Sequence, residues 1–291
     1  MSEIARYFKE LCLSDGTKNE TMMGLLKQFY SEKRAEKIFN KWLSEVEMRA
    51  NGIKTGQNIY TLMNEDYNES LMLIGGSNYD RLIAQGEWIE KNQDFFGKDI
   101  LDVGCLNGLM TCFIARLFPE SKVVGIDNNK PAIINAKKLA KTLRLDNAKF
   151  VFVPFSRIDG TYDTVFTSLF LHENYNIVAP STYNTMNNEE KIDYWYGQIN
   201  PTIEKISSVL NENGTAICFE RYYYNIALAG LLKAFERNGL DLSIDKVAVS
   251  KYAMEEGIAS YILKKRQTTE GNYQRYYEAL KNKYGERELL K

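Results

Sequence analysis

One stretch, residues 98–129, limits the possible folds of this chain more than any other. It begins with a short apolar run, Asp99 to Val103, that enters a glycine-bearing turn, as buried strands do. Apolar residues then recur with helical spacing from Leu109 to Leu117. Lys122 to Ile126 is a second apolar run, and Asp127 closes it. Strand, glycine turn, helix, strand and acid together predict a βαβ unit whose first turn faces a ligand.

The residues of this turn restrict the ligand. Glycines at 104 and 108 let the backbone come close to a ligand where a Cβ atom would clash. Asp127 at the tip of the second strand can accept hydrogen bonds from both hydroxyls of a ribose. A dinucleotide or S-adenosylmethionine would fit, but the dinucleotide fingerprint G-x-G-x-x-G is absent, because Leu106 and Leu109 occupy two of its positions. A pyrophosphate therefore lacks its usual binding turn.

The stretch resembles motif I of the class I S-adenosylmethionine-dependent methyltransferases, a hydrophobic run followed by D-x-G-x-G-x-G. Asp102, Gly104 and Gly108 match this motif, whereas Leu106 replaces its central glycine. The resemblance extends over residues 95–265. It implies a Rossmann-like α/β fold with a seven-stranded, doubly wound, mostly parallel sheet, here preceded by an α-helical N-terminal region. It also implies S-adenosyl-L-methionine as cofactor and S-adenosyl-L-homocysteine as product.

The same resemblance implies a set of cofactor contacts. Asp102 is expected to help hold the methionine amine, and Asp127 to hold the ribose. In the family, an acidic or polar residue after the third strand often meets the adenine; here Phe155 and Ser156 stand there, without an acid until Asp159. Adenine recognition is thus expected to rest on stacking and backbone groups. The other predicted cofactor-binding residues are Gly104, Cys105, Asn107, Gly108, Asn128 and Ser168.

Composition excludes several classes of protein. The chain has 37 Lys and Arg against 38 Asp and Glu, so the strongly basic character of many nucleic-acid binders is absent. Its four cysteines show no C-x-x-C spacing, which favours free thiols in a reducing cytosol. No apolar run is long enough to span a membrane and the N-terminus is polar, so a cytoplasmic location is expected. One histidine among scattered carboxylates predicts no metal site.

The chain divides, by pattern, into three parts. Residues 1–95 form a helical lid or substrate region, 96–266 the cofactor-binding α/β domain with an acceptor insertion at 174–200, and 267–291 a helical C-terminal tail. The N-terminal helices are amphipathic and must bury a face against the sheet domain or against a second copy in a homodimer. Individual elements expected along the chain include a helix over 58–74 that Gly75-Gly76 ends, a helix from Pro201 capped by Asn200, and last strands over 242–249 and 259–263.

The exit of the fourth predicted strand carries the candidate catalytic residues. His172, the only histidine, follows this strand, which in the family faces both cofactor and acceptor. A neutral imidazole can take a proton from an attacking oxygen or nitrogen, and Glu173 is the rival base. The segment after it is rich in tyrosine and asparagine, which suits either a packed core or the wall of a pocket for a polar organic acceptor. The predicted substrate-binding residues are Tyr175, Tyr194, Arg221 and Tyr222.

These features predict methyl transfer to an oxygen or nitrogen of a small organic acceptor, such as a metabolite or natural product. One alternative is an RNA methyltransferase, whose grip on phosphates would need a basic groove. The residues available for it are Lys33, Arg34, Lys264, Lys265 and Arg266. A second alternative is a non-catalytic regulatory protein that binds S-adenosylmethionine. A membrane is not an expected partner. A nucleic acid is a less expected partner than a small molecule, because the basic and acidic residues nearly balance.

Overall fold

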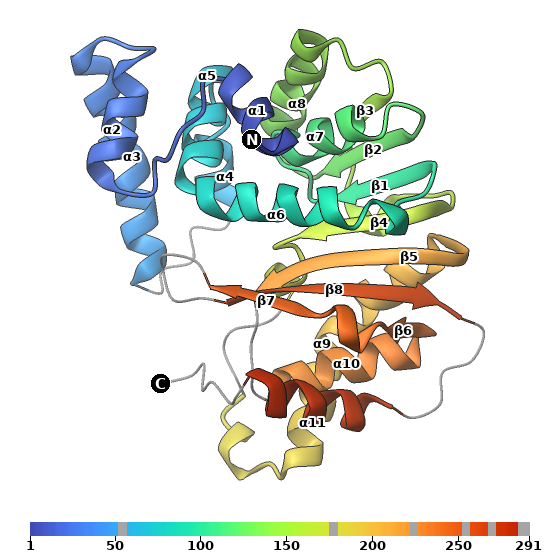
Figure 1. The fold of residues 1–291 in the computed structure, drawn as a ribbon. Helices are drawn as coiled ribbons and strands as arrows, with labels where there is room; N and C mark the ends of the chain where they lie inside the picture. Colours follow the sequence, from blue (N-terminus) through green and yellow to red (C-terminus); the bar gives the residue numbers. More distant parts are fainter. Residues whose placement is uncertain (52–56, 175–179, 222–225, 252–256, 267–271, 285–291) are drawn as a thin grey trace. The chain divides into compact units, whose positions relative to one another are not determined.

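The computed structural model describes residues 1–51, 57–174, 180–221, 226–251, 257–266 and 272–284 (Figure 1). Its strands follow the order β3-β2-β1-β4-β5-β8-β6, and β7 pairs with β8. The predicted α/β class is confirmed, although the described residues form eight strands rather than seven. The chain makes two compact units: a first unit of residues 1–93 and 104–155, and a second unit of residues 94–103 and 156–291. The predicted three-part division stays a prediction.

The first unit contains the N-terminal helices and the glycine turn at residues 104–108. Strands β2 and β3 run parallel, so that Asp127, the last residue of β2, pairs with Phe152. Asn129 caps α8 by accepting a hydrogen bond from N of Ala132 at 3.0 Å, and Pro131 occupies the first turn, where its missing N–H costs nothing. The elements are α1 (Glu3–Glu10), α2 (Asn19–Lys27), α3 (Glu32–Ala50), α4 (Gln57–Leu62), α5 (Tyr67–Ser70), α6 (Tyr79–Lys91), α7 (Leu109–Leu117), β2 (Lys122–Asp127), α8 (Lys130–Leu143) and β3 (Ala148–Phe152).

The predicted helix over 58–74 is wrong in two respects. Asp66 interrupts it and caps α5 by accepting hydrogen bonds from N of Asn68 and N of Glu69. The chain then continues from Leu71 to Gly76 as a fully buried π-helix, so the glycine pair lies inside a helix instead of ending one. A Cβ atom at position 75 would lie 2.7 Å from Cδ1 of Leu13. The glycines are therefore required for close packing, which a local pattern does not reveal.

The second unit holds three parallel strands and an antiparallel edge. In it β1 pairs with β4 and β4 with β5, all parallel, whereas β8 runs antiparallel to β5, β6 and β7. Helices α9, α10 and α11 pack beside one another (Figure 1). The elements are β1 (Asp99–Val103), β4 (Tyr162–Ser168), α9 (Asn188–Ser208), β5 (Leu210–Arg221), α10 (Ile226–Arg237), β6 (Leu240–Leu242), β7 (Ala248–Lys251), β8 (Gly257–Lys265) and α11 (Tyr273–Tyr284).

The helix predicted to start at Pro201 begins thirteen residues earlier, at Asn188 in α9. Asn187 caps it in a capping box, in which the side chains of Asn187 and Glu190 each accept a hydrogen bond from the other residue's backbone N–H. Pro201 lies inside the helix, and Asn200 is not a cap. A proline that normally starts or ends helices is here tolerated within one, so the second half of the predicted acceptor insertion is helical.

The last strands also differ from expectation at one point. The strand predicted over 242–249 is two short strands, β6 and β7, separated by a 3-10 turn from Ile244 to Lys246. The strand predicted over 259–263 is confirmed as the longer β8, which lies between β5 and β6. Because β1, β4 and β5 are parallel, their carboxyl ends share one edge of the second unit. That edge carries Asp102, Ser168 and Glu220.

Candidate active site

The glycine turn of the first unit is held closely by its own backbone. N of Gly104 and N of Cys105 both donate to the carbonyl of Ile126, at 2.9 and 3.0 Å. Gly104 and Gly108 have φ angles of 74° and 76°, which favour glycine. A Cβ atom at Gly108 would lie 2.8 Å from Cβ of Ala136 and from the ring of Phe150. Glycine at 108 is therefore required by both its conformation and its surroundings.

Leu106 stands in this turn where the family motif has its central glycine. Its φ angle is 48°, a conformation that side chains other than glycine adopt at a cost. N of Leu106 donates to Oδ2 of Asp127 at 2.9 Å. The strained residue is thus fixed by the acid at the tip of β2.

Asp127 holds two backbone segments, the glycine turn and the residue that caps α8. Besides Leu106, it binds N of Asn129, which donates to Oδ1 at 2.8 Å. Burial raises the pKa of Asp127, and the hydrogen bonds from the backbone of Asn129 and Leu106 oppose that rise. A carboxylate offers about four acceptor sites, so the backbone bonds from Leu106, Asn128 and Asn129 do not use all of them. Asn128, also predicted as a cofactor contact, is exposed beside it.

Asn107 is buried, and its side chain is committed within the protein. Its amide nitrogen donates to the carbonyl oxygen and to Oγ of Ser70, at 3.2 and 3.0 Å, and its Oδ1 accepts from N of Leu109. The predicted cofactor contact of Asn107 therefore concerns its backbone. Cys105 is buried, and Phe155 is half-buried in the 3-10 turn after β3.

In the second unit, the strand edge brings His172 and Glu220 together. Nδ1 of His172 donates to Oε1 of Glu220 at 2.8 Å. The other oxygen of Glu220 accepts from N of Leu171 at 2.7 Å and from N of His172 at 3.2 Å. Oε1 of Glu173 lies 3.4 Å from Nε2 of His172. The carboxylate of Glu220 is 1% exposed, so it fixes the ring from inside the protein.

This arrangement determines the charge of the imidazole. Burial opposes the charged form of His172, but hydrogen bonds to Glu173 and Glu220 outweigh it and raise the pKa of His172 to about 9. The imidazole is therefore protonated at neutral pH. The sequence patterns did not identify Glu220 as the partner of His172. Its position directly before the predicted site residue Arg221 was the available signal.

The remaining predicted residues of the second unit fall into different surroundings. Asp102 is buried on β1, Ser168 is half-buried at the end of β4, and Ser156 is exposed. Arg221 is half-buried at the end of β5. Tyr175 and Tyr222 lie outside the described residues.

Tyr194 belongs to a closed aromatic cluster. Its ring lies 5.7 Å from that of Tyr183 and 5.3 Å from that of Trp195, both edge to face. Nε1 of Trp195 donates to the hydroxyl of Tyr183 at 2.8 Å. Trp195 is buried and the two tyrosines are half-buried, so part of the Tyr194 ring stays accessible.

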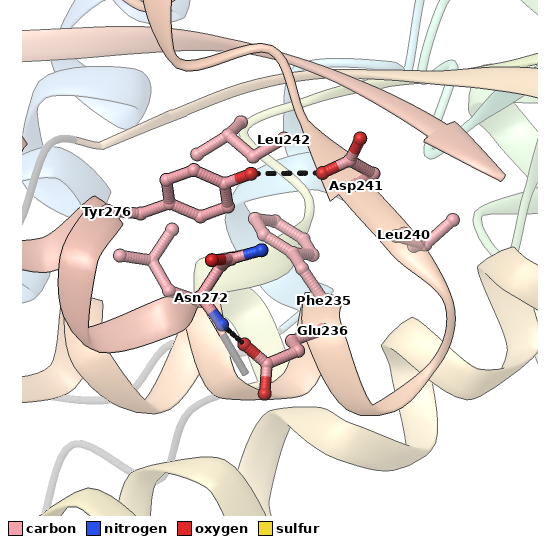
Figure 2. Close-up of a pocket in the computed structure, with 8 residues that line it drawn as sticks. Phe235, Glu236, Leu240, Asp241, Leu242, Asn272 and Tyr276 are labelled. Atoms are coloured by element: carbon pink, nitrogen blue, oxygen red, sulfur yellow. Dashed lines mark hydrogen bonds between the residues drawn. The ribbon is translucent and has the colours of Figure 1, made fainter. Parts of the chain in front are cut away.

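A crevice in the second unit lies between α10, β6 and α11 (Figure 2). Its volume of about 10 Å³ suits about one water molecule. The hydroxyl of Tyr276 donates to Oδ1 of Asp241 across it at 3.0 Å. None of the residues that line it is a predicted site residue. It is too small for a cofactor and is a packing defect at the helix junction.

Two further features concern the described part of the chain. No three His, Cys, Asp or Glu side chains gather there as a metal ion would require. Within the same ranges, every helix is too short or too polar to traverse a bilayer.

Comparison with known proteins identifies the class. Residues 95–238 match the model of a methyltransferase domain family. The strand order, with β8 antiparallel between β5 and β6, fits the predicted class I topology. This part of the chain belongs to that family. The protein thus contains a class I S-adenosylmethionine-dependent methyltransferase domain, whose cofactor is S-adenosyl-L-methionine.

Individual relatives are distant. A tRNA (guanine-N(7)-)-methyltransferase from Microcystis aeruginosa is 34% identical over 74 residues, which is 25% of this chain and 35% of that enzyme. The magnesium protoporphyrin IX methyltransferase of Synechocystis with bound S-adenosylmethionine is 14% identical at a TM-score of 0.46, covering 68% of this chain and 84% of that one. An O-methyltransferase of a trans-AT PKS multienzyme from Brevibacillus brevis is 15% identical at 0.47, covering 70% and 78%. The assignment rests on the family match and the topology.

Proposed function

We propose that this protein transfers the methyl group of S-adenosylmethionine to an oxygen or nitrogen of a small organic acceptor, releasing S-adenosylhomocysteine. The observation that carries the proposal is the braced glycine turn within the matched domain. There, Gly104 and Gly108 adopt the left-handed conformation, Ala136 and Phe150 leave no room for a Cβ atom at position 108, and Asp127 holds the turn through the backbone N–H of Leu106.

The residues present fit the cofactor. Backbone groups at Gly104, Cys105 and Gly108 would approach it closely, and the free acceptor capacity of Asp127 suits the hydroxyl pair of a ribose. Asp102, buried on β1, is proposed for the methionine amine. The weaker assignments, on the adenine side and nearby, are Asn107, Asn128, Phe155, Ser156 and Ser168. When bound, the cofactor supplies an electrophilic methyl group on a sulfonium.

For the chain's own residues, the main tasks are alignment and proton removal. Holding acceptor and methyl group in line can lower a barrier by ~7–11 kcal/mol, whereas a general base contributes about 10²- to 10⁴-fold in rate. We propose His172 and Glu173 for the second task. Because His172 is protonated at neutral pH, its Nε2 can take a proton from the methyl acceptor only after the ring has lost its own proton from that atom. Glu173, which is more exposed than His172, is the rival base.

Two observations favour a small acceptor over RNA. Nζ of Lys265 donates to the carbonyls of Ser207 and Leu210, both at 2.7 Å, and Nζ of Lys264 binds the hydroxyl of Thr215. Arg266 pairs with Asp241 at 3.1 Å. Lys264 and Lys265, two of the residues that an RNA groove would need, are thus engaged within the second unit, whereas Arg266 stays exposed. Tyr194, and by the sequence argument Tyr175, Arg221 and Tyr222, would contact the acceptor.

One observation favours the RNA alternative: the partial similarity to a tRNA methyltransferase. An assay of S-adenosylhomocysteine formation discriminates the candidates, with a panel of phenols, carboxylic acids and amines in one arm and tRNA in the other. Turnover with a small acceptor that changes little with added salt supports the proposal. Turnover with tRNA that falls steeply with salt supports the alternative. Cofactor binding without turnover in either arm indicates a regulatory protein and contradicts the proposal.

A further inference from the structure

The glycine turn is held from behind by helices that precede the matched domain. Ser70, fully buried at the end of α5, accepts both hydrogen bonds of the Asn107 amide group. Asn107 in turn accepts from N of Leu109, the first residue of α7. A single buried serine in the N-terminal region therefore fixes the side chain at the centre of the turn.

Ser70 is itself held by a second buried amide. Its Oγ donates to Oδ1 of Asn64 at 2.8 Å, and Asn64 donates to the carbonyl of Tyr60 at 2.7 Å. The amide nitrogen of Asn135, on α8, donates to the carbonyl of Asn64 at 3.0 Å. Asn64, Asn107 and Asn135 are each less than 9% exposed, so this is a buried polar network within the first unit. Such networks fix geometry when every member is satisfied.

Two other hydrogen bonds connect the N-terminal region to the turn and to the residues beside it. The buried hydroxyl of Tyr7, on α1, donates to the carbonyl of Leu109 at 2.9 Å. Asn129, whose backbone N–H binds Asp127, donates from its side chain to Oγ1 of Thr61 on α4 at 3.1 Å. Three separate helices thus bind the turn and the acid that braces it.

We propose that Ser70 is a positioning residue for the cofactor: it orients Asn107, and the N-terminal helices are thereby part of the S-adenosylmethionine site. This inference rests on the proposed function. It assigns a role in cofactor binding to a residue outside residues 95–238. We expect loss of the Ser70 hydroxyl to change the conformation of the turn and thereby to weaken cofactor binding. Ser70 would act in this way without contacting the cofactor.

The test is calorimetric titration of the full chain with S-adenosylmethionine and S-adenosylhomocysteine, well below the unfolding midpoint. Ser70→Ala is expected to weaken binding of both by about five- to tenfold, the effect of one hydrogen bond. Ser77→Ala is the matched control, because the Oγ of Ser77 donates to the carbonyl of Leu73 and accepts from Nδ2 of Asn78, and neither partner belongs to the turn. Tyr30→Phe is a second control, since it removes a hydroxyl bond to Asp66 in the same region without touching the turn.

A coupling measurement separates positioning from mere stabilisation. Asn107→Asp keeps the size of the side chain but loses its donors to Ser70, so the double variant should bind the cofactor no more weakly than the weaker single variant. Strictly additive losses, or Ser70→Ala binding like the wild type, overturn the proposal. If Ser70→Ala does not fold, Ser70→Cys, which keeps the volume and only weak hydrogen bonding, carries the same expectation. Failure of the wild type itself to bind overturns the proposed function and this inference together.

Discussion

Glu220 accepts a hydrogen bond from Nδ1 of His172 at 2.8 Å, while its second oxygen accepts from the backbone of the same histidine. The acid therefore fixes both the orientation and the charge of the ring. A histidine that leaves β4 and an acid at the end of β5 meet because the two strands are parallel neighbours. The hydrogen bond between His172 and Glu220 and the geometry of the glycine turn lead to four predictions.

The first concerns the charge of His172. Because it is the only histidine, its ring signals in an NMR titration are unambiguous. The expected pKa is about 9 in the wild type. Glu220→Gln should lower it, because the neutral amide no longer stabilises the imidazolium, and Glu173→Gln should do the same. A wild-type pKa near the ordinary value of 6.5 contradicts the pairing.

The second concerns stability and pH. Since the folded-state pKa of His172 lies above its ordinary 6.5, the folded protein binds a proton that the unfolded chain has lost. This contribution is fully present below about pH 6.5 and is lost as the pH rises through about 9. The free energy of unfolding from urea titrations should thus fall across that window by more in the wild type than in His172→Gln. Equal pH dependence in both proteins would contradict a raised pKa of His172 in the folded state.

The third concerns catalysis. With an acceptor in hand, turnover should rise with pH toward 9 if neutral His172 is the base. His172→Ala should lower turnover by about 10²- to 10⁴-fold and leave the affinity for S-adenosylmethionine unchanged. If His172→Ala leaves turnover unchanged, His172 is not the base. Glu173 is then the remaining candidate, and Glu173→Gln should lower turnover.

The fourth concerns the turn. Gly108→Ala combines a φ of 76° with Cβ contacts at 2.8 Å, so it should reduce the free energy of unfolding by about 2–5 kcal/mol. Gly24→Ala, on α2, is the control, because its Cβ would meet nothing within 4 Å. It should raise stability by about 0.5–1 kcal/mol. Equal effects at the two positions, measured by chemical denaturation, would contradict the account.

Much of the fold could be predicted from local patterns. The βαβ unit over 98–129 was evident because strand, turn and helix each have a characteristic spacing, and the acid at 127 ends its strand. Local patterns failed where packing decides. Gly75 and Gly76 look like a helix end, but close contact with Leu13 and Leu25 explains them. Pro201 looks like a helix start, yet the cap is Asn187.

The candidate site, too, has features that local patterns indicate and features that they miss. The positive φ angles of Gly104 and Gly108 and the place of Asp127 at the end of its strand agree with the local pattern, whereas their roles in cofactor binding stay predictions. The partners Glu220 of His172 and Ser70 of Asn107 are 48 and 37 residues away, so only the folded chain brings them together. The sequence separation of a hydrogen-bonded pair, more than its chemistry, set the limit.

The most direct test of the central claim is titration calorimetry of the purified protein with S-adenosylmethionine and, separately, with NAD, repeated for Asp127→Ala. Both the proposed ribose contact and the observed hydrogen bond from N of Leu106 depend on this carboxylate. Binding of S-adenosylmethionine alone, markedly weakened in Asp127→Ala, is the expected result. Binding of NAD instead, or S-adenosylmethionine affinity that does not change in the variant, would contradict the assignment of the turn.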